Sequence, residues 1–440
     1  MVAATSVRQQ VQVCLGKSGL SLGSLVYARQ GQRENSAFAY DEAWLSSAAR
    51  FSVSADLPLV PGHQAHKAAS PHDSVFHGAI ADTAPDAWGR RVIARDHVKR
   101  RKRDPHLPAL TALDCLLAVD DFSRVGALRL RDAQGAWLRT VAAGPRSTPP
   151  LIELERSFQA SRAVERGQET AEDLRYLQGR GTSLGGMRPK CTLLDADGRL
   201  AIGKFPSVDD VRSVTRGEVL ALRLAARAGI AAAEARIVSL GSAGDAVAVI
   251  RRFDRDEADG RIPYQSAASL LQASREEDRS YTEIADAIRS HGHAPTQDLQ
   301  QLWRRLVFNL LITNVDDHLQ NHGFLHVAHG QWRLAPAFDI NPFPEKDRES
   351  KTWLSERDGP ITDVQMLLAR AAYFALQPAQ ALTVLGEVHA AVADWRKLAV
   401  SADVGLKPQE LDDFAPAFEH GQTAAAAALL GRRTRRAARP

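Results

Sequence analysis

Residues 314–321, with the sequence NVDDHLQN, bring together two carboxylates, a histidine and three carboxamides. Asp316 and Asn321 stand five residues apart, and a further carboxylate, Asp339, follows in the segment PAFDINP. A carboxylate can accept the proton of a hydroxyl group, and carboxylate and amide oxygens are the hard ligands that Mg²⁺ favours. These residue types predict a site in which Asp316 activates a hydroxyl group beside Mg²⁺ held by Asn321 and Asp339. The alternative is an ordinary helix end and turn, where Asn and Asp are also common.

The elements around this segment must position it. Apolar residues recur at three- and four-residue spacing from Leu299 to Leu311, which predicts a helix with Thr296 as its N-cap. After the polar segment, residues 323–327 and 331–334 are typical of two short strands joined by a turn. An aspartate, an asparagine five residues later, a hairpin and a second aspartate follow the order of the catalytic and metal-binding loops of protein kinases.

Upstream residues could contact phosphate groups. The segment 179–190, GRGTSLGGMRPK, is rich in glycine and leads into a predicted hairpin formed by 191–194 and 199–205. Glycines let backbone N–H groups approach phosphate oxygens. Lys204 lies in an apolar strand, where its charge is costly unless it meets an anion, and Glu218 near the start of the next predicted helix is a candidate partner. A plain surface loop and a surface lysine on an edge strand remain the alternatives.

The composition is that of a soluble globular protein, with 44% apolar and 25% charged residues among 440. A chain of this length is longer than a single hydrophobic core can accommodate, so two or three packed units are expected. The sequence contains neither a run of eighteen apolar residues nor a signal-peptide core, so we expect a cytoplasmic protein that does not contact a membrane. The three cysteines have no CxxC pairing and are expected to be reduced.

Two further local patterns are a group of arginines at the carboxyl terminus and a group of histidines. The net charge of +4 comes from a run of five arginines in the last nine residues, which predicts a solvated tail rather than a nucleic-acid contact. Four histidines, His63, His66, His72 and His77, fall within fifteen residues but lack the cysteine partners and paired spacing of a zinc site. A polar loop is predicted there.

Taken together, several motifs resemble the HipA family of serine/threonine kinases, the toxins of bacterial toxin–antitoxin pairs. The resemblance extends to the amino-terminal segment and covers nearly the whole chain. It rests on these stretches: Phe76 and PDAWGR at 85–90, the Gly-rich 183–190, IGK at 202–204, RFDR at 252–255, NVDDHLQN at 314–321 and PAFDINP at 336–342.

This resemblance implies a role for each matching position. Asp316 would be the catalytic base, and Asn321 and Asp339 would bind Mg²⁺. Ser183, in the Gly-rich loop, would be autophosphorylated, which would place a charge of roughly −2 where nucleotide phosphates bind. The remaining positions implied to contact the nucleotide are Lys204, Glu218, Gly185, Gly186, Arg252, Phe253 and His318.

The expected fold is therefore α+β and protein-kinase-like, of HipA type, with a β-containing amino-terminal part and a mostly helical carboxyl-terminal part. We expect a mixed subdomain at 1–145, a nucleotide-binding β lobe at 146–255, a helical catalytic lobe at 256–430 and a disordered basic tail at 431–440. The expected activity is transfer of phosphate from ATP, with Mg²⁺, to a protein serine or threonine.

The resemblance also implies the partners. The substrate would be an aminoacyl-tRNA synthetase or another translation factor. A small HipB-like helix-turn-helix antitoxin would carry the complex to operator DNA, so that the chain meets DNA indirectly. A small-molecule kinase and a non-catalytic co-repressor are the two alternatives.

Overall fold

The computed structural model describes residues 6–138, 151–178, 186–241, 244–347 and 349–437. The chain forms two compact units, each assembled from separate stretches. The first unit comprises Met1–Val208, Arg251–Glu277 and Leu325–Gly330, and the second comprises Asp209–Ile250, Asp278–Phe324 and Gln331–Pro440. Among the described residues, no helix is long and apolar enough to span a bilayer.

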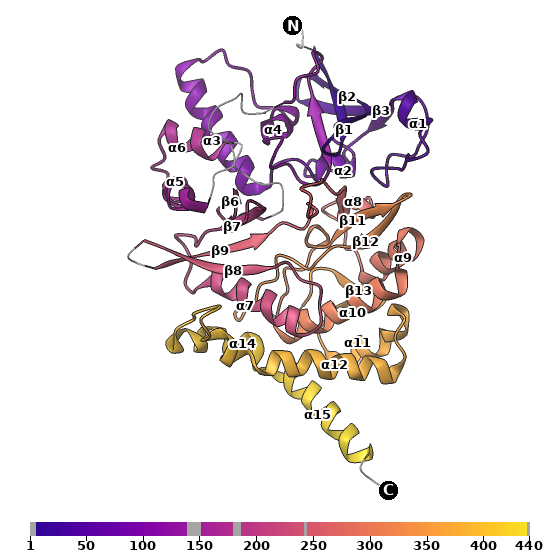
Figure 1. The fold of residues 1–440 in the computed structure, drawn as a ribbon, viewed down its shortest axis with the longest axis vertical. Helices are drawn as coiled ribbons and strands as arrows, with labels where there is room; N and C mark the ends of the chain where they lie inside the picture. The colour runs from indigo at the N-terminus through magenta and orange to yellow at the C-terminus, as the bar shows by residue number, and fades with distance from the viewer. Residues whose placement is uncertain (1–5, 139–150, 179–185, 242–243, 348, 438–440) are drawn as a thin grey trace. The chain divides into compact units, whose positions relative to one another are not determined.

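An antiparallel sheet dominates the amino-terminal part of the first unit (Figure 1). Its strand order is β4-β3-β2-β1-β5, formed by β4 (Gln64–His66), β3 (Arg33–Tyr40), β2 (Leu20–Gln30), β1 (Ser6–Leu15) and β5 (Leu128–Arg131). Alternate residues such as Val13, Leu25 and Phe38 are buried, as expected for a sheet with one face toward a core. Four helices belong to the same part: α1 (Glu42–Leu45), α2 (Gly78–Ala81), α3 (Ala87–Arg103) and α4 (Ala112–Ala118).

The rest of the first unit is built around a hairpin and two helices. The hairpin is formed by β6 (Lys190–Leu194) and β7 (Leu200–Lys204), whose residues are all buried. Helices α5 (Leu154–Arg166) and α6 (Ala171–Leu177) share an apolar cluster with α3, in which Trp88, Val164 and Leu174 meet. The unit also contains β10 (Tyr264–Ser266) and α8 (Ala267–Leu270).

A buried ion pair links α3 to β6. Asp86 is the N-cap of α3 and accepts a hydrogen bond of 2.7 Å from the backbone N–H of Gly89. The ammonium of Lys190 lies 3.0 Å from the Asp86 carboxylate, and the two side chains are only 2% and 1% exposed. Because each charge is shielded from water, each depends on the other for stabilisation.

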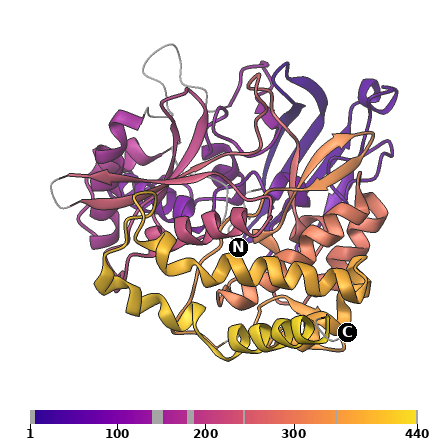
Figure 2. The same ribbon diagram turned by 60° about the horizontal axis from the view of Figure 1, so that its bottom comes forward.

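The second unit is mainly helical. Its central helix is α10 (Pro295–Leu311), which packs against α9 (Tyr281–His291), α11 (Val364–Arg370) and α12 (Pro378–Ala393) (Figure 1). Helix α12 also packs against α15 (Gly421–Ala437), drawn in yellow in Figure 2. The remaining helices are α7 (Val214–Arg227), α13 (Trp395–Ala399) and α14 (Leu411–Phe418).

Short strands complete this unit. The strands β8 (Ala235–Leu240) and β9 (Asp245–Arg251) pair antiparallel, as do β13 (Trp353–Ser355) and β14 (Gly359–Pro360). The strands predicted after the polar segment are β11 (Gly323–Ala328), whose residues 325–328 belong to the first unit, and β12 (Gln331–Leu334). A hydrogen bond of 2.8 Å from Ala335 N to Gly323 O joins their outer ends.

The observed elements confirm the expected α+β fold, with one local correction. Helix α10 starts at Pro295, with Ala294 rather than Thr296 as N-cap, because proline is well suited to the first helical position. Helix α15 spans Gly421–Ala437, and the expected disorder of the basic tail at 431–440 stays a prediction. The proposed subdomain boundaries at 145 and 255 stay a prediction.

The buried Asp86–Lys190 pair predicts that removal of one of its two charges strongly lowers stability. Lys190→Met should lower the free energy of unfolding of the first unit by about 3–5 kcal/mol, because it leaves the buried Asp86 carboxylate without its cation. Urea denaturation followed by circular dichroism measures this change. The matched control is Arg156→Met, whose partner Glu172 is exposed, and it should cost less than about 1 kcal/mol. Equal effects of the two substitutions would contradict the account.

Candidate active site

The polar segment begins at a sharp turn that follows α10. Thr313 has a φ of +53°, in the left-handed region, so the chain reverses direction there. The Thr313 hydroxyl donates to Ala417 O at 3.0 Å, and Phe343 N donates to Thr313 O at 3.1 Å. These two contacts hold the turn against α14 and against the segment that follows Asp339.

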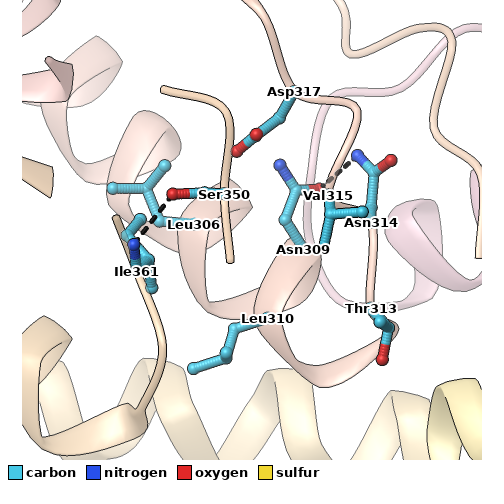
Figure 3. A pocket seen from close by; sticks show the side chains of 9 residues that line it. All are labelled: Leu306, Asn309, Leu310, Thr313, Asn314, Val315, Asp317, Ser350 and Ile361. Atoms are coloured by element: carbon cyan, nitrogen blue, oxygen red, sulfur yellow. Dashed lines mark hydrogen bonds between the residues drawn. The ribbon is translucent and has the colours of Figure 1, made fainter. Parts of the chain in front are cut away.

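A chain of buried amides connects α10 to the Asp339 segment. Asn314 Nδ2 donates to Asn309 Oδ1 at 3.1 Å, and Asn314 Oδ1 accepts from Asn341 N at 3.3 Å (Figure 3 shows the first of these). Asn341 Nδ2 in turn donates to Asp339 Oδ1 at 3.3 Å. The side chains of Asn309 and Asn314 are buried, so these hydrogen bonds fix the two loops relative to each other.

The two neighbouring aspartates occupy opposite environments. The Asp316 side chain is 43% exposed, and its carboxylate accepts from the ammonium of Lys351. Asp317 is 2% exposed and accepts from the hydroxyl of Tyr281 and, at 3.0 Å, from the backbone N–H of Lys351. Of the two carboxylates, Asp316 is therefore the one that an incoming hydroxyl group can reach.

Burial raises the pKa of Asp317 to about 7, although the hydrogen bonds from Tyr281 and from the backbone act in the opposite direction. Its neighbour His322 is also fully buried, which lowers the pKa of the imidazole to about 3. Tyr281 OH lies 3.2 Å from His322 Nε2. This internal cluster anchors the segment, and Figure 3 shows Asp317 among the residues that line a neighbouring pocket.

The structure brings Asn321 and Asp339 to one small pocket. Asn321 ends a short 3₁₀ turn, and its Nδ2 donates to Asp316 O at 2.8 Å. Its Oδ1 is buried and, among the described residues, has no hydrogen-bond partner. Asp339 adopts a φ of +55°, which turns the chain beside the same pocket. The pocket is lined by Arg305, Asn309, Asn314, Asp317, Asn321, His322, Ala337, Phe338, Asp339 and Ile340.

His318 lies near both outer carboxylates. Burial lowers the pKa of His318, while the charges of Asp316 and Asp339 act to raise it. The hydrogen bond from Asn321 to Asp316 O joins these two residues, and Asn321 and Asp339 line one pocket. In this unit the structure thus gathers four of the predicted site residues: Asp316, His318, Asn321 and Asp339.

The strand and backbone segment that bear Asp339 are also anchored. Buried Arg305 donates from α10 to Ala335 O at 2.7 Å, and burial lowers the pKa of its guanidinium to about 10. Ala337 N donates to Ala231 O at 2.7 Å, and Ala233 N donates to Ala337 O at 2.9 Å. Backbone pairing on one side and an arginine on the other therefore position Asp339.

The predicted nucleotide contacts of the first unit have the following positions. Lys204 is the buried last residue of β7, and Gly186 has a φ of +95°, which glycine adopts without strain. Arg252 is buried, and its guanidinium is bound to Asp254, with Arg252 Nε to Asp254 Oδ1 at 2.8 Å. Phe253 lies against Tyr264, with ring centroids 6.4 Å apart.

Three further predicted positions complete the set. Glu218 is buried near the start of α7, in the second unit. Ser183 and Gly185 lie outside the described residues. The pairing of Lys204 with Glu218 stays a prediction.

Sequence reasoning missed two residues that touch the site. Lys351 lies thirty-five positions after Asp316, and Tyr281 lies thirty-six positions before Asp317. Neither stands in a recognisable motif, so spacing along the chain gave no signal for them. Tyr281 is the buried first residue of α9, so its residue type alone indicates a core position rather than a site.

Comparisons with known proteins identify the family. A model described as the HipA-like C-terminal domain matches residues 182–395, and one described as the HipA N-terminal domain matches residues 13–120. A solved chain from the Shewanella oneidensis MR-1 toxin–antitoxin system HipA, HipB and operator DNA complex has a TM-score of 0.63 and 16% identity, covering 94% of this chain and 96% of that one.

Two curated relatives are also similar. A "putative kinase" of Haemophilus influenzae is 27% identical over 38% of this chain and 54% of its own length. "Putative kinase Y4mE" of Sinorhizobium fredii is 26% identical over 51% of each chain. The chain therefore spans about half the length of the curated relatives that it matches.

The fold and the paired domain matches define a protein of the HipA-type α+β fold. The chain belongs to the HipA family.

The raised pKa of Asp317 predicts how stability depends on pH. A carboxyl group whose pKa is higher in the folded than in the unfolded state binds more protons when folded, so the protein loses stability as pH rises from about 4 to about 7. Asp317→Asn removes this titration and should flatten that part of the stability profile. Thermal unfolding at a series of pH values tests this. An unchanged slope in the variant would contradict the assignment, and Asp347→Asn, at an exposed position, is the control.

Proposed function

We propose that the protein is an ATP- and Mg²⁺-dependent serine/threonine protein kinase and the toxin of a toxin–antitoxin module. The observation that supports this most is the placement of an exposed carboxylate, Asp316, next to a pocket lined by Asn321 and Asp339. The three residues have the types and the chain order that phosphoryl transfer needs. The curated relatives that are called putative kinases agree with this proposal.

The residues of the pocket fit a magnesium ion. Asn321 offers a buried amide oxygen without a hydrogen-bond partner among the described residues, and Asp339 offers a carboxylate. Both are oxygen donors of the kind that Mg²⁺ takes, usually with several water molecules and nucleotide phosphates as its other ligands. When bound, the ion supplies positive charge that offsets the charge of the phosphates.

Side chains of the protein would carry out the remaining steps of phosphoryl transfer. Asp316 orients the acceptor hydroxyl and takes its proton, because its carboxylate is accessible whereas Asp317 is committed to Tyr281 and the backbone. Lys351 holds Asp316 in the resting state and must release the carboxylate when a substrate hydroxyl arrives. Lys204 would bind nucleotide phosphates, with Glu218 as its partner, and the Gly-rich loop around Gly185 and Gly186 would cover them.

The adenine contacts follow from the sequence resemblance. The Arg252 side chain is already bound to Asp254, so the backbone near Arg252 and Phe253 rather than the guanidinium would meet the base. His318, whose pKa the charges of Asp316 and Asp339 act to raise, would lie close to the phosphates. Ser183 would be the site of autophosphorylation, where added charge would repel nucleotide phosphates.

The proposed partners come from the family and from the solved relative. That relative is part of a complex with HipB and operator DNA. We propose a HipB-like helix-turn-helix antitoxin as partner of this chain, with operator DNA contacted through it. The protein substrate would be an aminoacyl-tRNA synthetase or another translation factor.

The assignment of Asp316 predicts a selective loss of catalysis. Asp316→Asn should lower phosphoryl transfer by about 10²–10⁴-fold, because the amide cannot accept the hydroxyl proton, while ATP binding is retained. Turnover of ATP with a serine-containing acceptor peptide and calorimetric ATP binding measure the two effects. Asp347→Asn, an exposed aspartate of the same unit, is the matched control and should be unchanged. Full turnover in Asp316→Asn would refute the role of Asp316.

A further inference from the structure

A cluster of metal-ligating side chains lies in the first unit, apart from the residues assigned to phosphoryl transfer. The histidine-rich segment that the sequence predicts to be a polar loop brings two of its four histidines together with an upstream aspartate. One ligand atom from each of Asp56, His66 and His77 lies within 4.8 Å of the others. The remaining two histidines of the segment, His63 and His72, are exposed.

Asp56 is held firmly in this cluster. Its Oδ1 accepts from the Ser54 hydroxyl at 2.5 Å, and both of its oxygens lie 3.2 Å from the backbone N–H of Gly78, at the start of α2. The Asp56 side chain is 15% exposed, and these contacts hold its carboxylate in a fixed position. A carboxylate fixed in this way offers an oxygen ligand to a metal ion.

His66 directs its Nδ1 atom, the potential metal ligand, toward Asp56. It ends β4, which pairs with β3 so that His66 faces Ser36. Its Nε2 lies 3.2 Å from the carbonyl oxygen of Ser74, which can only accept, so Nε2 carries the hydrogen in the neutral ring. Nδ1 then has a lone pair, and it faces Asp56 Oδ2 at 3.4 Å. The Nδ1 lone pair and Asp56 Oδ2 can therefore both ligate a cation placed between them.

His77 supplies the third position. It precedes α2, is 2% exposed, and its ring centroid lies 4.9 Å from that of His66. Its Nδ1 is buried and has no hydrogen-bond partner among the described residues. A buried polar atom without a partner is costly and points to a ligand.

The spacing of these atoms matches a tetrahedral metal site. Bonds of roughly 2.0–2.2 Å from Zn²⁺ to nitrogen and oxygen place neighbouring ligand atoms roughly 3.3–3.6 Å apart. The separation of His66 Nδ1 and Asp56 Oδ2 is 3.4 Å. The outer limit of 4.8 Å for the cluster leaves the third ligand to move by at most roughly 1.5 Å, which side-chain rotation supplies.

We propose that Asp56, His66 and His77 bind one Zn²⁺ ion, with a water molecule as the fourth ligand. Two imidazoles and one carboxylate form a donor set that zinc accepts readily. The contact from His66 Nε2 to a backbone carbonyl is the outer-shell hydrogen bond that orients a metal-bound histidine. The ion joins the loop that carries Asp56, strand β4 and helix α2, and so stabilises the first unit.

The test uses the full-length protein, stripped with a chelator and dialysed against Zn²⁺ alone without nucleotide. Metal content per chain is measured by mass spectrometry, and thermal unfolding is measured with and without Zn²⁺. We expect about one equivalent of zinc in the wild type and a rise in Tm of roughly 5 °C at a hundredfold excess over Kd. His66→Gln and His77→Gln should retain less than about a tenth of this zinc and show no rise in Tm.

His63→Gln is the matched control, because this exposed histidine lies in the same segment, and it should bind zinc like the wild type. Since His77→Gln alters a buried position, His66→Gln, whose side chain is 26% exposed, carries the test if the former does not fold. The proposal is overturned if the wild type binds no stoichiometric zinc. It is equally overturned if His66→Gln keeps its zinc, since the ion then lies elsewhere.

Discussion

The buried carboxamide of Asn314 is the contact on which the candidate active site depends. It donates to Asn309 on α10 and accepts from the backbone of Asn341, two residues beyond Asp339. A buried amide that loses either partner leaves a polar group unsatisfied, at a cost of about 1–3 kcal/mol. This one side chain thereby fixes the loop that carries Asp316 against the loop that carries Asp339, although the two lie more than twenty residues apart in sequence.

The Asn314 amide can position both loops because α10, which carries its partner Asn309, is itself firmly packed. Its apolar face, including Trp303, Leu306 and Phe308, is fully buried, and Trp303 Nε1 donates to Leu367 O at 3.0 Å. Hydrophobic burial therefore places the end of the helix, and hydrogen bonds then place the polar residues beyond it. The Asp316 carboxylate is left exposed while the neighbouring Asp317 is buried, so that adjacent residues of one type occupy opposite environments.

The sequence was informative where structure follows from local periodicity. The stripe from Leu299 to Leu311 predicted α10, and the order of Asp316, Asn321 and Asp339 predicted residues that lie in one neighbourhood. It failed where the decisive contact joins distant segments. Lys351 beside Asp316 and Lys190 beside Asp86 follow from tertiary packing, which no short motif encodes. The N-cap of α10 was misplaced by two residues because Thr296 competed with the preference of Pro295 for the first helical position.

The histidine cluster is a second case in which contacts between distant segments could not be predicted from the sequence. Asp56, His66 and His77 are separated by ten and eleven residues, a spacing unlike that of metal motifs in sequence. A strand, a turn and a short helix start bring them together only in the folded chain. A site assembled from three separate elements can therefore be recognised from side-chain geometry in the folded chain but not from residue spacing in the sequence.

Incubation of the purified protein with Mg-ATP, followed by intact-mass and peptide mass spectrometry, tests the central claim most directly. The account predicts one added phosphate on Ser183 in the wild type and none in Asp316→Asn prepared alongside. The absence of phosphate from the wild type, together with no thermal shift on adding ATP, would contradict it and favour a non-catalytic co-repressor. ATP binding without self-phosphorylation would contradict the Ser183 assignment and favour a small-molecule kinase.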